Sequence, residues 1–259
     1  MFSGGLSVTL PSESFSANEW KARCELAALY RLIAYFRMTD LIDTHISMAI
    51  PDDPGHFLIN RYGKVFEQMC ASDLVRIDKF GHVKDLQLEQ SNVNAAGFVI
   101  HSAIHQARPD LKCIIHTHTP HGAGVSAQEE GLLPISQHAL KFYGCLSYHG
   151  YEGIALRAEE KERLIADLGT NNAMILRNHG LLVGGRHVAH AFHEIYFLER
   201  ACQIQIHALA GGRQLSYPPE EVRRRTAEQF QRDEAEEIIQ RAWTAALSLI
   251  ADEKDLYCS

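Results

Sequence analysis

Short β-type runs are grouped between helical segments along this chain, and this order restricts the folds that it can adopt. The β-type runs are residues 46–50, 56–59, 74–77, 113–117, a run around Leu146, 173–177 and 181–183. Apolar residues recur at helical spacing over 16–37, 92–107, 122–129, 136–142, 159–168 and 188–209, and a final helix opens at Pro218. The sequence therefore predicts an α/β (α+β layered) fold, a three-layer α/β/α sandwich around a mainly antiparallel sheet.

Local composition divides the chain into an N-terminal arm and one folded domain. Residues 1–17 are rich in Ser and Gly and are expected to form an N-terminal arm. Ser16 and Glu19 then have the spacing of a helix capping box. The stretch 211–218 is too short to define an independent domain. Residues 18–259 are accordingly expected to form a single domain with a C-terminal helix.

The net charge limits the binding partners that are expected for this protein, and the cysteines indicate its cellular compartment. The chain has 25 Lys and Arg against 32 Asp and Glu, a formal net charge of -7, so neither nucleic acid nor an anionic membrane is expected as a partner. No apolar run reaches the roughly 18 residues of a membrane helix, and the first residues carry no basic leader. Six cysteines without a CxxC pair are typical of the reducing cytoplasm.

Three histidines carry the strongest chemical signal. His116 and His118 end an apolar β-type run two residues apart, and the two-residue period of a strand points both imidazoles to the same face. His179 lies before Gly180 in a tight link between two apolar runs, where glycine lets the backbone turn. Three neutral imidazoles with a vacant fourth position suit a catalytic divalent metal, zinc first, and Mn²⁺, Fe²⁺ and Co²⁺ are compatible with the same ligands.

The segments around these histidines resemble the class II aldolase/adducin family. Both metal signatures of that family are matched in order, by residues 114–118 and 175–181, and residues 98–110 and 131–136 resemble its adducin branch. The similarity spans about residues 20–211. It implies an α/β/α sandwich, a homo-oligomer with a tetramer favoured, and a metal that binds the hydroxyl and carbonyl oxygens of a small aldol or sugar-like substrate.

The chain departs from the aldolases of this family at several functional positions. Their carboxylate acid/base lies on the helix ahead of the metal-binding strand, and Gly97 stands at that position here. Ala95 and Ala96 match the serines that hold substrate phosphate, and Thr44-His45 matches the Gly-Asn anion loop. The resemblance therefore implies the metal site without the catalytic carboxylate or the phosphate-binding groups.

Three other polar residues are candidates for the missing proton carrier. His138 is the first choice because it falls near the position of the family's catalytic tyrosine, and an imidazole titrates near neutral pH. His121, on the turn after the ligands, recurs in the aldolases, and Glu130 is the third candidate. His101 and His105, four residues apart, are assigned to packing or to an exposed surface rather than to a second metal pair.

The resemblance also suggests substrate-binding residues and a function. Ser47, Asn60 and Gly63 lie in the segment that shapes the substrate pocket of relatives, and they are carried over as substrate-binding candidates. The intact histidine set favours a metal-dependent lyase of the class II aldolase type that acts on a small hydroxy-carbonyl substrate. Gly97 motivates the alternative, a non-catalytic adducin-like scaffold or interaction module that keeps the fold and the metal site.

Overall fold

A mixed β-sheet forms the middle of the computed structural model, which describes residues 15–84, 93–153, 158–232 and 235–259. Within these residues seven strands pair in the order β3-β2-β1-β4-β7-β6-β5. All neighbouring strands are antiparallel except β5 and β6, which are parallel, and this confirms the mainly antiparallel sheet. The strands are β1 (His45–Ala49), β2 (His56–Ile59), β3 (Val75–Asp78), β4 (Cys113–Thr117), β5 (Leu146–His149), β6 (Ala173–Leu176) and β7 (Gly180–Gly185).

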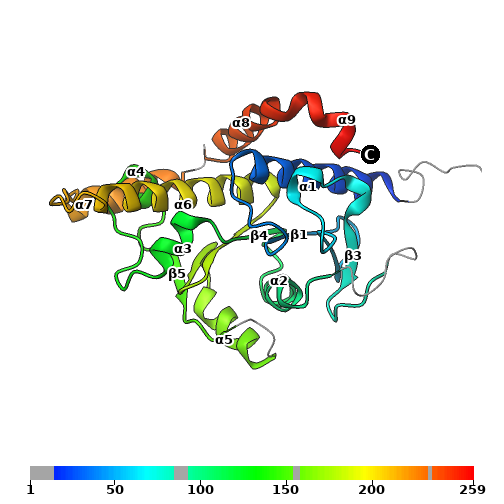
Figure 1. Cartoon of the computed structure of the whole chain (residues 1–259), viewed down its shortest axis with the longest axis horizontal. Helices are drawn as coiled ribbons and strands as arrows, with labels where there is room; N and C mark the ends of the chain where they lie inside the picture. The colour runs from blue at the N-terminus through cyan, green and yellow to red at the C-terminus, as the bar shows by residue number, and fades with distance from the viewer. Residues whose placement is uncertain (1–14, 85–92, 154–157, 233–234) are drawn as a thin grey trace, which may run out of the picture.

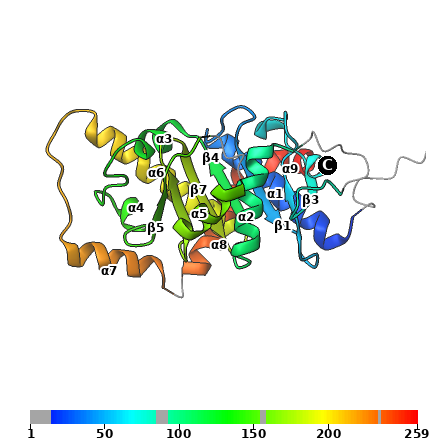
Figure 2. The ribbon, with the colours of Figure 1, turned by 90° about the horizontal axis from the view of Figure 1, so that it is seen from below.

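Helices cover both faces of the sheet (Figure 1). α1, α6 and α8 lie along one face, and α2 and α5 lie along the other, in front of the strands in Figure 2. This confirms the α/β/α sandwich. The helices of the described residues are α1 (Ala17–Tyr35), α2 (Ala95–Ala107), α3 (Pro120–Ser126), α4 (Gln137–Leu140), α5 (Ala158–Leu168), α6 (Val188–Leu209), α7 (Glu220–Phe230), α8 (Ala235–Leu247) and α9 (Lys254–Tyr257), with 3₁₀ turns η2 (Phe66–Gln68), η3 (Ala71–Asp73) and η5 (Ser248–Glu253).

The two-residue period of the central strands divides the core between these layers. In β4, Ile115 packs into the cluster that includes α1 and α6, and its neighbour Ile114 packs into the cluster that includes α2 and α5. In β7, Leu181 and Leu182 divide in the same way. Because successive strand side chains point to opposite faces, an apolar run buried on both sides fits only a middle layer.

The C-terminal helix differs from its prediction. The sequence predicts one helix from Pro218, but the structure has α7 and a separate α8, and residues 233–234 between them lie outside the described part. α7 contacts α4, whereas α8 packs on α6 and α1, with the Trp243 ring 5.6 Å from that of Phe192. One straight helix cannot make both sets of contacts. Tertiary packing therefore divides the predicted helix into two. The predicted arm lies outside the described residues up to residue 14.

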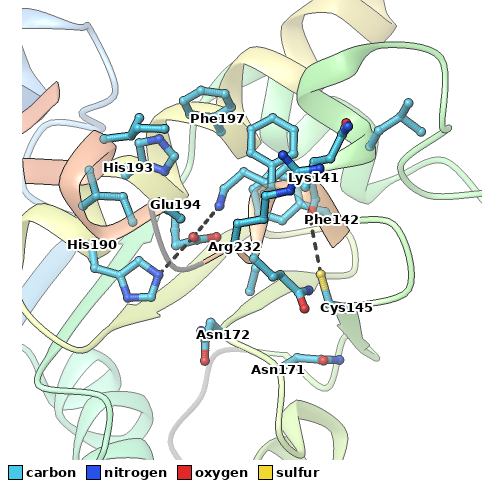
Figure 3. Close-up of a pocket in the computed structure, with 18 of the residues that line it drawn as sticks. Lys141, Phe142, Cys145, Asn171, Asn172, His190, His193, Glu194, Phe197 and Arg232 are labelled. Carbon is cyan, nitrogen blue, oxygen red and sulfur yellow. Dashed lines mark hydrogen bonds and ion pairs between the residues drawn. The ribbon is translucent and has the colours of Figure 1, made fainter. Parts of the chain in front are cut away.

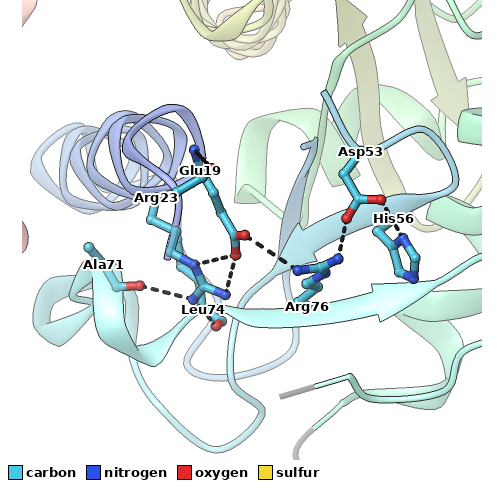
Figure 4. A network of polar contacts seen from close by, with 8 residues as sticks. Glu19, Arg23, Asp53, His56, Ala71, Leu74 and Arg76 are labelled. Carbon is cyan, nitrogen blue, oxygen red and sulfur yellow. Dashed lines mark hydrogen bonds and ion pairs between the residues drawn. The ribbon is translucent and has the colours of Figure 1, made fainter. Parts of the chain in front are cut away.

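The N-terminal end of α1 is held by a buried polar network (Figure 4). Ser16 caps the helix by accepting a hydrogen bond from the Glu19 amide at 3.1 Å. The Glu19 carboxylate does not close the capping box but accepts from the Arg23 guanidinium at 2.9 and 3.0 Å. Arg23 is fully buried and donates to the carbonyls of Ala71 and Leu74. The network joins α1 to η3 and to the start of β3.

Every helix of the described residues is too short or too polar to cross a membrane.

Candidate metal centre

The structure brings together the three histidines singled out from the sequence. His116 lies one residue before the end of β4 and pairs with Leu182 of β7, and His179 lies in the turn that joins β6 to β7. The Nε2 atom of His118 is 2.8 Å from Nε2 of His116 and 2.9 Å from Nε2 of His179. All three ligand atoms lie within 4.8 Å of one another. Among the described residues, this is the one group of at least three His, Cys, Asp or Glu side chains with that geometry.

The turn that carries His179 depends on unusual backbone geometry. Asn178 has a φ of 55°, in the left-handed region. The His179 amide donates to the Ser126 hydroxyl at 3.1 Å, so the start of the turn is fixed to the end of α3. A Cβ on Gly180 would collide with the Thr117 carbonyl oxygen, which leaves glycine as the residue that lets β7 approach β4 here. The glycine therefore brings His179 next to the β4 histidines.

Hydrogen bonds to the other ring nitrogens orient two of these imidazoles. Nδ1 of His116 lies 2.9 Å from the Leu181 carbonyl oxygen, to which it donates, and this leaves Nε2 with its lone pair toward the centre. Nδ1 of His118 lies 3.0 Å from the Asp40 carboxylate. Partners of this kind fix the tautomer and the ring orientation of metal-binding histidines. Asp40 was missed in the sequence because it is far from His118 along the chain and belongs to no motif.

The protonation state of the histidines also fits a metal. Burial, with the neighbouring imidazoles, lowers the pKa of His116 well below its usual value and that of His179 to about 4. Both rings are therefore neutral at pH 7, the form in which histidine donates a lone pair to a metal. Three imidazoles that meet in this way are chemically suited to zinc or a similar borderline ion.

His121, three residues after His118 in the sequence, forms a polar pair with a carboxylate of α6. Its Nδ1 is 3.0 Å from Oε1 of Glu199 on α6, and the Thr119 hydroxyl donates to the same carboxylate. Burial raises the pKa of Glu199 despite these donors. A cavity of about 400 Å³ adjoins the pair and is also lined by Tyr196 and Arg200. The structure thus supplies His121 with a carboxylate partner that the sequence does not reveal.

The other two proton-carrier candidates also have neighbours outside the three histidines. His138 lies on α4 with its ring 5.2 Å from that of Phe197, and burial, with nearby Arg200, lowers its pKa. Glu130 is exposed. In the described part of the chain neither residue has a hydrogen bond or ring contact with the three histidines. A catalytic role for His138 stays a prediction.

The substrate-binding candidates are spread over different environments. Ser47 is fully buried, with its hydroxyl 2.5 Å from Nδ1 of His101 and 2.8 Å from Nε2 of His105. Asn60 is buried and accepts from the Tyr30 hydroxyl at 3.1 Å. Gly63 lies in an exposed turn with a φ of 87°. The side chains of Ser47 and Asn60 are thus engaged inside the protein.

Two further residues adjoin the centre and were not selected as site residues from the sequence. The exposed Tyr151 has its ring 6.4 Å from that of His179. His45 of β1 stacks on His116 at 5.7 Å between ring centroids. A Cβ at Gly97 would lie 2.6 Å from Cδ2 of His45, so no side chain fits at position 97 without displacing this ring. The side chains of Ala95 and Ala96 lie outside the described part.

A larger cavity of about 1320 Å³ lies elsewhere, among α4, α6, α7 and α8 (Figure 3). Its wall holds a buried ion pair, in which Nζ of Lys141 is 2.6 Å from Oε1 of Glu194. His190 contacts the same carboxylate at 3.2 Å. None of the three histidines of the candidate centre lines this cavity. This cavity and the three histidines therefore lie in different parts of the structure.

Comparisons with known proteins agree with this geometry. The family model described as Class II Aldolase and Adducin N-terminal domain matches residues 24–206. An aldolase II superfamily protein from Pseudomonas syringae has a crystal structure that is 47% identical, with a TM-score of 0.90 over 96% of this chain and 99% of that chain. L-fuculose 1-phosphate aldolase from Glaciozyma antarctica is 27% identical, with a TM-score of 0.82 over 93% of each chain. Alpha-adducin of Rattus norvegicus is 44% identical over 200 residues, which are 77% of this chain and 27% of that protein.

Proposed function

The chain belongs to the class II aldolase and adducin family, and on this basis we propose that it is a metal-dependent lyase for small hydroxy-carbonyl compounds. Zinc is the proposed metal, with His116, His118 and His179 as its ligands. The observation that carries the proposal is the meeting of three Nε2 atoms within 4.8 Å of one another, with the rings of His116 and His118 oriented by partners at Nδ1. Zinc bound there would act as a Lewis acid on the carbonyl or hydroxyl oxygen of the substrate.

We assign proton transfer to His121. With its Nδ1 proton held by Glu199 at 3.0 Å, the imidazole keeps Nε2 as the basic atom. A base oriented by a carboxylate is a recurring arrangement for moving protons near neutral pH. The residue also lies three positions after His118, on the first turn of α3. In the described part of the chain the ring of His138 contacts Phe197 and no carboxylate partner comparable to Glu199.

The proposal is tested by metal-dependent turnover. Purified full-length protein, with and without one equivalent of Zn²⁺, Mn²⁺, Fe²⁺ or Co²⁺, is incubated with a panel of hydroxy-aldehydes, hydroxy-ketones and their phosphates. We expect aldehyde release that a chelator abolishes and that added metal restores. Protein that holds stoichiometric metal but cleaves, isomerises or dehydrates no member of the panel would contradict the assignment as a lyase.

Removal of Asp40 should weaken metal binding without removing a ligand. We expect Asp40→Ala to raise the dissociation constant for Zn²⁺ about tenfold, the lower end of the effect of losing such an orienting partner. We expect the smaller loss of affinity because the Asp40 side chain is half exposed, so water can replace part of its interaction with His118. Competition with a zinc-binding dye measures the change. Asp43→Ala is the matched control in the same loop, and an equal effect of both changes would mean that general charge, not orientation of His118, is responsible.

The adducin relationship favours a second candidate function. Alpha-adducin shares 44% identity over 200 residues of this chain, and Gly97 leaves no room for an acidic side chain beside His45. In this alternative the domain is a homo-oligomeric scaffold whose metal centre is structural. Sedimentation analysis with and without chelator separates the two: metal-dependent assembly without turnover favours the scaffold, and metal-dependent turnover favours the lyase.

A further inference from the structure

The cavity that adjoins His121 and Glu199 is also lined by two arginines that have no acidic partner. It has a volume of about 400 Å³, and its wall includes Arg37 and Arg200. Among the described residues, no carboxylate forms an ion pair with either guanidinium. The fold therefore leaves two positive charges at one cavity, and a hollow lined by charges of one sign attracts ligands of the opposite sign.

Arg37 has a backbone conformation that usually belongs to glycine. It follows the C-terminal end of α1, and its φ of 57° lies in the left-handed region. The Met38 amide donates to the Ile33 carbonyl at 2.9 Å, which closes the end of the helix. Glycine is the residue most often found where a helix ends in this way, because a side chain is unfavourable there. The chain instead keeps an arginine, whose exposed side chain lines the cavity.

Arg200 is held in place by uncharged neighbours on α6. Its Nη1 donates to Oε1 of Gln203 at 2.6 Å, and its guanidinium carbon lies 5.1 Å from the centre of the Tyr196 ring. These contacts orient the guanidinium but do not neutralise its charge. A planar guanidinium with several N–H donors matches the oxygens of a carboxylate or a phosphate. Arg200 is thus positioned to bind an anion before the anion arrives.

The carboxylate in the cavity wall is already engaged by other donors. Oε1 of Glu199 accepts from Nδ1 of His121 at 3.0 Å, and Oε2 accepts from the Thr119 hydroxyl. Glu199 is 8% exposed, and burial raises the pKa of its carboxyl group. Among the residues that line this cavity, two guanidinium groups therefore outnumber one engaged carboxylate. The remaining charge is positive.

We propose that this cavity is a binding site for the oxyanion of a small molecule, a carboxylate or a phosphate, held between Arg37 and Arg200. Its volume is within the range of small-molecule sites, about 300–1,000 Å³. The side chains of Tyr35, Phe36 and Tyr196 also line it and supply apolar contacts for the rest of the molecule. None of the three histidines of the candidate centre lines this cavity. The inference therefore goes beyond the proposed lyase and does not depend on a bound metal.

Calorimetric titration with inorganic phosphate and with malonate tests the site and separates the two kinds of anion. Purified full-length protein is titrated at constant ionic strength, before and after a chelator has removed bound metal. We expect saturable binding that survives metal removal, and the anion that binds more tightly identifies the ligand as a phosphate or a carboxylate. Arg37→Gln and Arg200→Gln should each weaken that anion about tenfold, the loss of a charge-assisted hydrogen bond. Arg232→Gln is the matched control, since Arg232 is exposed and lines the larger cavity, and it should leave binding unchanged.

A glycine variant separates anion binding from a structural role of Arg37. Arg37→Gly should weaken the anion at least tenfold, while the melting temperature of the anion-free protein stays the same or rises, because glycine adopts the left-handed conformation without strain. An arginine that served only to interact with the C-terminal end of α1 would behave in the opposite way. Its replacement would lower the melting temperature and leave anion binding unchanged, which would overturn the inference.

Three further results would also overturn it. The first is wild-type protein that binds neither phosphate nor malonate. The second is equal weakening in Arg37→Gln, Arg200→Gln and Arg232→Gln, which would mean that general charge attracts the anion. The third is binding that disappears with the metal, because the anion would then lie at the three histidines. A protein that binds the anion but shows no turnover would contradict the proposed lyase and leave this site standing.

Discussion

Replacing His116 or His179 by alanine should reduce the affinity for Zn²⁺ by about 100-fold or more. Loss of an orienting partner alone costs a metal site about 10–100-fold, and these changes remove a ligand atom from a set of three. Residue 179 is as informative as residue 116 because it comes from a different segment, the β6–β7 turn. Elemental analysis after dialysis, followed by competition with a zinc chelator of known affinity, measures the change.

The control for this experiment is a histidine outside the three-histidine centre, which pairs with a carboxylate. His82 is exposed and its Nδ1 is 3.1 Å from Asp78, so His82→Ala removes an imidazole without touching the centre. Metal content should remain at the wild-type value in this variant. If His116→Ala and His179→Ala also kept wild-type metal content and affinity, the three imidazoles would not be the metal site, and the proposed lyase would lose its main support.

Replacing Arg23 by alanine should lower the free energy of unfolding by about 3–5 kcal/mol. Removal of one partner of a buried ion pair leaves the other charge uncompensated, and effects of this size are typical. Here Glu19 is 5% exposed and, among the described residues, would keep Arg76 as its cationic partner, 3.5 Å away and partly exposed. The carbonyls of Ala71 and Leu74 would lose a donor as well. Urea denaturation followed by circular dichroism measures the loss.

The C-terminal helix α8 supplies a matched control for the Arg23 experiment. Glu237 and Arg241 have the same four-residue spacing as Glu19 and Arg23 but are mostly exposed. Arg241→Ala should change the free energy of unfolding by less than about 1 kcal/mol, because exposed ion pairs contribute little. Replacing Glu19 and Arg23 together by Leu and Met should recover much of the stability lost in Arg23→Ala. Equal losses in Arg23→Ala and Arg241→Ala would show that burial of the network does not determine its contribution.

The layered fold was predictable because its signals are local. The apolar run 113–117 became β4 with the expected bounds, and α6 spans the predicted residues 188–209. Division of the C-terminal segment into α7 and α8 was not predictable, since it depends on which earlier helix each half contacts. A periodic pattern identifies a helical segment but does not identify its packing partner.

The candidate centre was predictable only in part. His116 and His118 follow from strand periodicity, and the link before Gly180 indicated His179. Asp40 contacts His118 from a loop, and Glu199 contacts His121 from the middle of α6, at sequence distances that no motif connects. His45, in the segment that resembles the family's anion loop, stacks on His116 from β1. Ser47 was chosen from the correct strand, but its side chain is fully buried and its hydroxyl contacts His101 and His105. Local patterns thus singled out the three histidines that the structure brings together, whereas their supporting groups depend on the tertiary structure.

The pairing of β4 with β7 also determines at which stage of folding the three imidazoles can bind one metal ion together. Thr117 lies opposite Leu181 in that pairing, so the three imidazoles meet only after two distant segments have joined. During synthesis, His116 and His118 leave the ribosome well before His179, and the unfinished chain offers two ligands at most. Binding to the complete centre favours the native state by mass action. A metal bound to the complete centre would therefore stabilise the paired β4 and β7 and not the unfolded chain.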